Sequence, residues 1–449
     1  MTDQTTPETA TRRWDPLATG SAHLFWAKIA GNGGYFVAVL IVARGLGPAG
    51  RGTVAFITVS ALVVAHVAGL GVGEATTVLA AREPPRRPAL LANALLFFLI
   101  SSLLAAAVAF TSLLLSGVGP AGVDAPELVI LACGIVACAV GEAGYSFLLG
   151  MERLRLLAYI TGCLSWVYAV VVFVLWAGPG LTVAGAALAW AATEALRTLV
   201  LVTVSRRRSP LGRPSRRLLL AEIGFGLRLW LGSLARFLNF RTDQILMGFL
   251  ASEAALGFYA VAVNASEILL YLPSSAATAL LPLIARTDPV RRGSETLRAF
   301  RSVAFVSVIG VVVAALLGPV ILPAIFGDAF DESVMPFLWL LPGTLGFAAS
   351  SVFSNALVGS SSPGLSSLGP IVSLVVGFAL DLVLIPSFEA TGAAAAASVA
   401  FLAGGAIALA TYRRVSPFPW RALLVPHRGD LDVLLALAGP FLRPRRSNA

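Results

Sequence analysis

The 449 residues of this chain are unusually apolar: 57% are hydrophobic and only 12% are charged, against about 25% charged in ordinary soluble domains. The mean hydropathy of +0.86 leaves no room for a sizeable soluble domain. Lysine and arginine outnumber aspartate and glutamate by 32 to 23, which gives a net charge of +9. The basic residues gather in short loops between apolar segments, which is typical of the inner face of a membrane protein and gives no reason to expect a nucleic-acid partner.

Long apolar segments follow one another along most of the chain, and each is long enough to cross a hydrocarbon core of about 30 Å. The first segment is too long for the core of a signal peptide, so we expect it to remain as a membrane anchor. The expected fold is an all-α integral membrane protein with about twelve transmembrane helices. The predicted spans are 21–43, 53–78, 89–117, 127–149, 156–177, 182–204, 223–249, 255–284, 302–326, 334–357, 366–386 and 390–412.

The loops between these spans alternate between arginine-rich and arginine-poor. The loop at 206–217 holds six arginines, whereas the next loop, around Ser252 and Glu253, holds none. Because basic loops stay inside, both termini are expected in the cytoplasm of a bacterium, with the spans in its cytoplasmic membrane. Anionic lipids of the inner leaflet are expected to attract the basic loops. The loop at 360–363 is predicted internal yet is uncharged, and it is the exception to the pattern.

Two internal matches predict that the chain is a duplication. LGPAGRGTVAF at 46–56 matches SEAALGFYAV at 252–261 when Gly52 is placed on Gly257, an offset of 205. AGAALA at 184–189 lies over TGAAAA at 391–396, at an offset of 207. Each half then has six spans, and because six is even the two halves are parallel repeats rather than inverted ones.

The duplication and the loop charges divide the chain into parts. A boundary is expected in the basic loop that follows the sixth span, which also contains two prolines. The tail after the last span has apolar stretches too short to cross a membrane, and suits an interfacial position. The expected parts are a cytoplasmic tail (1–20), an N-terminal lobe (21–204), a basic cytoplasmic linker (205–222), a C-terminal lobe (223–412) and a basic cytoplasmic tail (413–449).

The seventh predicted span holds more ionisable residues than any other. An ionisable group at the bilayer centre costs about 2.5–3.5 kcal/mol, so such groups usually face a cavity or a partner. On an uninterrupted helix Arg228, Arg236, Asn239 and Asp243 fall within about 80° of one another. This polar face predicts a water-accessible lumen; the alternative is packing ion pairs without a cavity.

A few other polar residues within spans are candidates for the same lumen or for its gating. Arg241 lies off the polar face at a depth that matches Glu267 of the eighth span, which predicts an ion pair. Lys28 and Asn32 share a face of the first span beside three glycines, so they are candidate lumen residues. The alternative for Lys28, near the internal end of the span, is that its side chain snorkels to the membrane surface. Glu142 is a lone acid in the fourth span and a candidate for coupling or for a structural hydrogen bond.

Signatures of enzymes and of metal sites are missing. No phosphate-binding GxxxxGK[ST] and no HExxH occurs, and Cys133, Cys138 and Cys163 lack the spacing of a metal site. No catalytic residue, metal or cofactor is therefore expected.

Glu194 and Arg197 lie three residues apart in the sixth span, and this spacing predicts an internal salt bridge.

Three stretches carry a family resemblance. They are ARGLGPAGRG at 43–52, the run from NFRTDQILMG to SSAATALLP at 239–282, and VLIPSFEATGAAAAAS at 383–398. They resemble three parts of the MOP superfamily of exporters, specifically of its polysaccharide (lipid-linked oligosaccharide) flippase branch. The first stretch is similar to the loop after the first helix, the second to the seventh and eighth helices, and the third to the loop between the last two helices. The middle stretch is the most specific, and the spacing of the three covers nearly the whole chain.

The resemblance implies two bundles of six helices around a V-shaped lumen with alternating access to the two membrane faces. The cargo of such flippases is an oligosaccharide on a polyprenyl pyrophosphate, which passes through a polar, often cationic lumen. Arg241 and Asp243 lie in the middle stretch and carry over as candidate lumen or gating residues. Arg236, on the polar face of the seventh span, is expected to attract a pyrophosphate or an acidic sugar. Arg44 and Arg51 are expected to tie the external loop. The implied partners are the lipid-linked glycan, membrane lipids and enzymes of glycan assembly.

Two other functions compete with the flippase. A cation-coupled multidrug exporter of the related branch should favour acidic residues in the first lobe, which has few besides Glu142 and Glu194. A membrane glycosyltransferase, polymerase or ligase needs a large external loop, and the loops here are short. Lipid II flippases of the superfamily typically have fourteen spans, so twelve favours the export of a particular glycan over general cell-wall precursor export.

Overall fold

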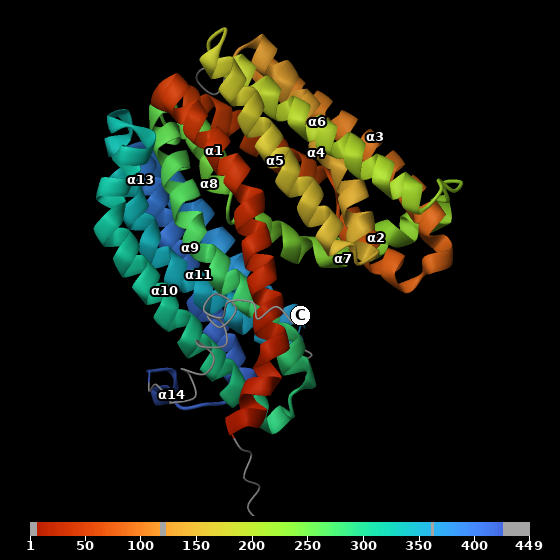
Figure 1. Cartoon of the computed structure of the whole chain (residues 1–449), viewed down its shortest axis with the longest axis vertical. Helices are drawn as coiled ribbons and strands as arrows, with labels where there is room; N and C mark the ends of the chain where they lie inside the picture. Colours follow the sequence, from red (N-terminus) through yellow and green to blue (C-terminus); the bar gives the residue numbers. More distant parts are fainter. Residues whose placement is uncertain (1–6, 117–122, 361–362, 425–449) are drawn as a thin grey trace, which may run out of the picture.

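The computed structural model describes residues 7–116, 123–360 and 363–424, and helices account for nearly all of them (Figure 1). No strand occurs within these ranges. The helices are α1 (Pro7–Ala68), α2 (Val72–Arg82), α3 (Arg87–Ser116), α4 (Ala125–Gly150), α5 (Leu154–Ala177), α6 (Val183–Arg208), α7 (Arg216–Leu238), α8 (Thr242–Leu250), α9 (Glu253–Arg286), α10 (Pro289–Phe326), α11 (Val334–Gly359), α12 (Pro363–Ser366), α13 (Leu368–Val415) and α14 (Arg421–Leu424), with short 3-10 turns η1 (Pro84–Arg86) and η2 (Asp328–Ser333).

The number of membrane spans agrees with the prediction. Within the described residues, ten helical segments are long and apolar enough to cross a membrane. Two of them bend sharply, at Gly47 in α1 and at Glu389 in α13, where the backbone φ angles are 70° and 45°. Each of these two contributes two spans, which gives twelve. The prediction of an all-α integral membrane protein is confirmed.

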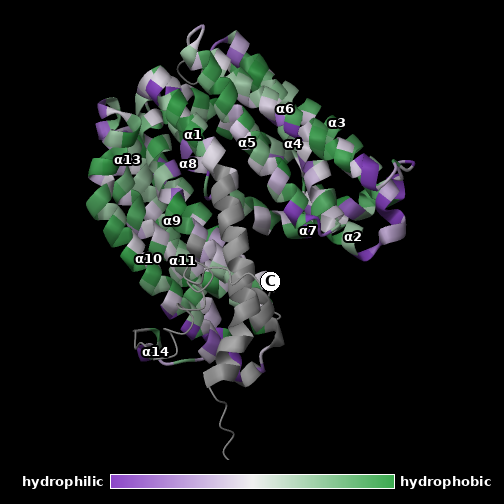
Figure 2. Ribbon diagram, in the orientation of Figure 1, coloured by the Kyte–Doolittle hydropathy of each residue, from purple (hydrophilic) through white to green (hydrophobic). Residues whose placement is uncertain are grey.

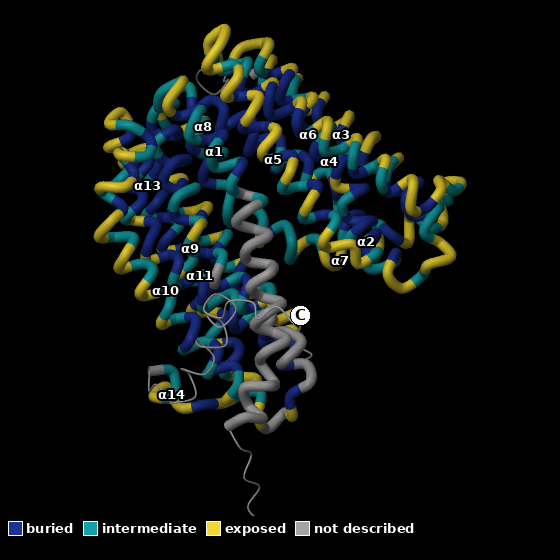
Figure 3. Tube along the Cα trace, in the orientation of Figure 1, coloured by how far each residue is buried: buried dark blue, intermediate teal, exposed yellow. Residues whose placement is uncertain are grey.

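The outer faces of the helices are apolar, and the charged residues lie mainly at the helix ends (Figure 2). Leu104 on α3 is 64% exposed and Leu316 on α10 is 72% exposed, while the faces toward the centre of each lobe are buried (Figure 3). Exposed aliphatic side chains on this scale would aggregate in water, but they are favourable against lipid tails. Most of the molecular surface is therefore lipid-facing.

The helices form two lobes that meet at one end and diverge toward the other (Figure 1). Helices α1 to α6 form the N-lobe and α8 to α13 the C-lobe, and α1 also packs against the C-lobe, so that it contributes to the cores of both. The basic loops between α2 and α3 and between α6 and α7 lie at the diverging end (Figure 1). The lobes therefore part on the arginine-rich side.

Two glycines that the duplication pairs in sequence meet at the closed end of the molecule. A Cβ on Gly52 would lie 2.0 Å from the carbonyl oxygen of Glu253, and one on Gly257 would lie 1.9 Å from the carbonyl oxygen of Pro48. Each glycine thus lets its own half approach the backbone of the other half, at the crossing of α1 and α9. This reciprocal contact is what a pseudo-twofold relation between two parallel repeats produces.

A second tie at the closed end comes from Arg44. Its Nε donates to the carbonyl oxygen of Ile325 at 2.8 Å, and its Nη2 donates to that of Ala324 at 3.0 Å. The guanidinium thus satisfies two carbonyls near the end of α10 in the other lobe. Arg44 therefore holds α1 against the end of α10 in the C-lobe.

The seventh predicted span is not one straight helix, contrary to the expectation for 223–249. Helix α7 ends at Leu238, and α8 begins only at Thr242. Although α7 follows the basic linker, it packs along α2 of the N-lobe, where Gly226 and Gly71 approach backbone to backbone. The Ser233 hydroxyl also donates to a carboxylate oxygen of Glu74. Helix α7 therefore connects the two lobes at the diverging end.

Candidate functional site

A cavity of about 460 Å³ lies between the lobes, and we call it the inter-lobe cavity. Residues of α1 and α6 form one wall, and residues of α8 and α9 and of the turn before α8 form the other. Four charged side chains lie in these walls: Arg51, Glu194, Arg241 and Glu267. The cavity is therefore both polar and shared by the two lobes, as a transport route requires.

The predicted ion pair between Arg241 and Glu267 is present. The Nη1 atom of Arg241 lies 2.7 Å from Oε1 of Glu267 and also donates to the carbonyl oxygen of Phe240 at 3.0 Å. The two side chains are 25% and 20% exposed, so the pair is desolvated on most sides yet borders the cavity. Arg241 sits in the break between α7 and α8, where its position is set by Glu267 rather than by a continuous helix.

Arg51 has a different place from the one the sequence suggested. It is only 4% exposed, and its Nε has no hydrogen-bond partner among the described residues. Its side chain lines the inter-lobe cavity instead of tying the loop between the first two spans. A guanidinium without a counter-ion in a poorly solvated wall favours an anion in the cavity beside it.

The polar face predicted for the seventh span does not form as one stripe. Arg228 and Arg236 are exposed on α7, and neither lines any of the four cavities described here. Asn239 lies in the break, where its Nδ2 donates to the carbonyl oxygens of Ala235 and Pro370, both at 2.8 Å. Asn239 is thereby linked to α13, and it lines a small cavity of about 20 Å³ together with Asp243, whereas Arg228 and Arg236 do not.

A pair of buried acids lies within the C-lobe. Asp243 is 8% exposed, accepts a hydrogen bond from the Tyr259 hydroxyl, and accepts another from the backbone N–H of Gln244 at 2.7 Å. Asp381, 3% exposed, lines the same small cavity of about 20 Å³, and its Oδ1 has no partner among the described residues. Sequence reasoning missed Asp381, although a lone acid in the eleventh predicted span was a signal for it.

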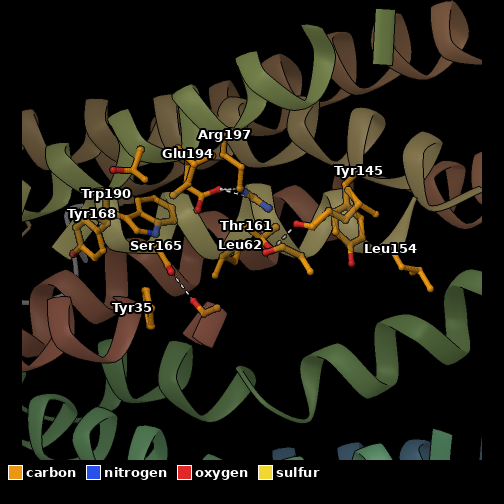
Figure 4. A pocket seen from close by; sticks show the side chains of 15 residues that line it. Tyr35, Leu62, Tyr145, Leu154, Thr161, Ser165, Tyr168, Trp190, Glu194 and Arg197 are labelled. Atoms are coloured by element: carbon orange, nitrogen blue, oxygen red, sulfur yellow. Dashed lines mark hydrogen bonds and ion pairs between the residues drawn. The ribbon is translucent and has the colours of Figure 1, made fainter. Parts of the chain in front are cut away.

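A second cavity of about 460 Å³ lies within the N-lobe, between α1, α4, α5 and α6, and we call it the N-lobe chamber (Figure 4). Four residues line both this chamber and the inter-lobe cavity: Tyr35, Leu62, Trp190 and Glu194. The two cavities therefore adjoin. The predicted salt bridge of the sixth span is present in the chamber wall, where the guanidinium of Arg197 contacts Oε2 of Glu194.

The remaining candidates are scattered. Glu142 accepts a hydrogen bond from the Ser146 hydroxyl at 2.6 Å and lines a smaller cavity of about 130 Å³ together with His66 and Glu74. The side chains of Lys28 and Asn32, two predicted lumen residues, lie outside the described part of the structure. Among the described residues, no cluster of three or more His, Cys, Asp or Glu side chains has the arrangement of a metal site.

The sequence matches a family model described as "Polysaccharide biosynthesis protein" over residues 17–288, more than half of the chain. The chain belongs to this polysaccharide biosynthesis protein family. The match includes Arg51, Arg241 and Glu267, and so includes the charged walls of the inter-lobe cavity. Among curated proteins, no sequence matches the chain.

Several solved structures share the fold, and three of them are described as a flippase or as transporters. The lipid II flippase MurJ in an inward closed conformation has a TM-score of 0.75 at 15% identity, over 96% of this chain and 94% of that one. A multidrug resistance MATE family transporter of the MOP superfamily, inward-facing, has a TM-score of 0.68 at 16% identity, over 85% and 94%. A MOP superfamily transporter from Pyrococcus furiosus has 0.61 at 18%, over 94% and 100%. At these identities the likeness establishes the MOP fold.

Proposed function

We propose that this protein is a flippase that moves a polyprenyl-pyrophosphate-linked oligosaccharide across the bacterial cytoplasmic membrane by alternating access. The observation that carries the proposal is the placement of Arg51 and Arg241, from opposite lobes, in the walls of one cavity. Membership of the polysaccharide biosynthesis protein family supports a glycan as the cargo. Both termini would then lie in the cytoplasm, beside the enzymes that assemble the glycan.

The electrostatics of the inter-lobe cavity favour a pyrophosphate. Arg51 has no ion-pair partner among the described residues, and Arg241 shares its charge with a single carboxylate, that of Glu267. An anion about 5 Å from one guanidinium gains roughly 3 kcal/mol at an effective dielectric constant near 20. Because the two arginines belong to different lobes, an anion between them would also draw the lobes together.

The shape of the molecule suits an inward-facing state. The lobes diverge on the side of the arginine-rich loops, which the positive-inside rule assigns to the cytoplasm. At the opposite end the lobes are held together through Arg44 and through the backbone contacts of Gly52 and Gly257. Cargo assembled in the cytoplasm would then enter from the side on which the lobes part.

A reconstituted flipping assay tests this function directly. Proteoliposomes containing the full-length protein would receive a fluorescent polyprenyl-pyrophosphate-linked sugar, and the fraction of lipid reduced by external dithionite would be followed with time. Arg51→Gln should lower the flipping rate at least tenfold without lowering the amount of reconstituted protein. Arg207→Gln removes an exposed arginine at the end of α6 and is the matched control. Wild-type liposomes that flip no faster than protein-free ones would refute the proposal.

A multidrug exporter is the second candidate, because MATE transporters share the fold and because the N-lobe gathers Glu74 and Glu142 around one small cavity. Acids at this position could bind a coupling cation. Uptake of a cationic fluorescent dye into the same proteoliposomes, driven by a proton or sodium gradient, distinguishes the two. Gradient-driven dye transport with no lipid flipping would favour the exporter.

A further inference from the structure

The N-lobe chamber has the chemical character of a carbohydrate site rather than of an anion site. Its charged residues, Glu194 and Arg197, neutralise one another, so the wall offers no excess positive charge to a pyrophosphate. Its volume of about 460 Å³ falls within the range of roughly 300–1,000 Å³ that is usual for small-molecule sites. The rest of the wall combines aromatic rings and hydroxyl groups: Tyr35, Tyr145, Thr161, Ser165, Tyr168, Trp190 and Thr193.

Several polar groups of the chamber remain available to a ligand. The hydroxyls of Thr161 and Thr193 donate to backbone carbonyls of their own helices, both at 2.8 Å, so each keeps its oxygen lone pairs as acceptors. The Tyr145 hydroxyl makes no hydrogen bond to the described residues and borders the chamber (Figure 4). Arg197 uses Nε and Nη2 for Glu194 and leaves Nη1 without a partner among these residues. The chamber thus offers both donors and acceptors to a ligand, from α4, α5 and α6.

Binding a sugar ring requires both aromatic surface and hydrogen-bonding groups. One face of a pyranose is made of C–H groups that pack on an aromatic ring, and its edges carry hydroxyls that both donate and accept. Trp190 and Tyr35, which line both cavities, supply aromatic surface at the junction. Glu194 and Arg197 supply charge-assisted hydrogen bonds, which are the stronger kind.

We infer that the N-lobe chamber is a saccharide subsite that holds the sugars adjoining the pyrophosphate, while the pyrophosphate itself lies in the inter-lobe cavity. This assignment rests on the proposed function and divides the cargo between two adjoining cavities by chemistry. The anionic linkage lies between Arg51 and Arg241, and the neutral sugars lie on the N-lobe alone. The N-lobe therefore determines which glycan binds, whereas the inter-lobe cavity recognises only the negative charge of the pyrophosphate.

Binding of two matched lipids to the full-length protein in nanodiscs tests the inference. The probes are a polyprenyl pyrophosphate without sugar and the same lipid carrying a neutral disaccharide. The double variant Tyr145→Phe/Thr161→Val removes two hydroxyls with little change of shape. It should weaken binding of the glycosylated lipid about tenfold, equivalent to about 1.4 kcal/mol, and leave binding of the bare lipid unchanged.

The controls separate this inference from the proposed function. Tyr159→Phe removes the hydroxyl of a tyrosine on α5 that is 72% exposed and lines neither the N-lobe chamber nor the inter-lobe cavity, and it should change neither affinity. Wild-type protein that binds both lipids equally, or a double variant that weakens both equally, would overturn the saccharide subsite alone. Wild-type protein that binds neither lipid would overturn the proposed function and the subsite with it.

Discussion

Replacing Gly52 or Gly257 by alanine should weaken the junction between the lobes. The added Cβ of Gly52→Ala would lie 2.0 Å from the carbonyl oxygen of Glu253, and that of Gly257→Ala would lie 1.9 Å from the carbonyl oxygen of Pro48. Both obstacles are backbone atoms, which cannot turn aside as a flexible side chain can. The lobes must therefore separate locally, or α1 and α9 must shift against each other.

The expected loss of stability can be estimated from the known cost of overpacking. Inserting a methyl group into a well-packed contact typically costs about 1–3 kcal/mol, and a clash with rigid backbone belongs at the upper end of that range. The two substitutions disturb the same crossing, so the double variant should lose less than the sum of the single losses. Gly224→Ala is the matched control, since no heavy atom lies within 4 Å of its added Cβ and alanine favours a helix interior.

Thermal unfolding followed with a thiol-reactive fluorophore measures the effect. Cys138 is buried, so its labelling reports loss of N-lobe packing, while Cys133 and Cys163 are exposed and set the baseline. Gly52→Ala and Gly257→Ala should each lower the melting temperature by at least a few degrees, and Gly224→Ala should not. If the two alanine variants melt with the wild type, the crossing of α1 and α9 is not the close backbone contact described.

Two further substitutions test the charged residues. Glu267→Gln should destabilise the protein by about 1–3 kcal/mol, because it leaves Arg241 without its counter-ion in a wall that is only partly solvated. The double variant Arg241→Gln/Glu267→Gln should recover part of this loss. Equal melting temperatures for the wild type, the single variant and the double variant would show that the pair is unimportant for stability. Arg236→Gln should leave the affinity for bare polyprenyl pyrophosphate unchanged in the nanodisc assay, because Arg236 is exposed on α7. A large loss of affinity would show that Arg236 does contact the pyrophosphate, as the sequence predicts.

The fold could be predicted from the sequence because the membrane imposes strong rules on composition. Apolar length gives the spans, and the sequence match of Gly52 with Gly257 pairs two glycines that meet at the crossing of α1 and α9. The ion pair between Arg241 and Glu267 could also be predicted, because depth in a membrane follows from position along each helix. These inferences depend only on distance along the chain.

The parts that could not be predicted depend on tertiary contacts. The break between α7 and α8 occurs at Asn239, Phe240 and Arg241, where the sequence has neither proline nor glycine. The break is stabilised by the bond from Asn239 to Pro370 and by Glu267, and helical periodicity carries no information about either. The sequence predicts that Arg51 lies at a loop, because it is near a turn, yet α1 resumes after the bend at Gly47 and Arg51 lies within the helix and lines the cavity.

Both ends of the molecule combine a close backbone fit with polar bonds, and this bears on how the transport cycle could run. At the closed end the fit is at Gly52 and Gly257, beside the bonds from Arg44 to α10. At the diverging end α7 meets α2 at Gly226 and Gly71, beside the bond from Ser233 to Glu74. Steric fits of this kind favour two discrete states over a continuum of tilts. An anion bound by both Arg51 and Arg241 would lower the free energy of whichever state brings the two guanidinium groups closest, so the cargo itself could bias the exchange.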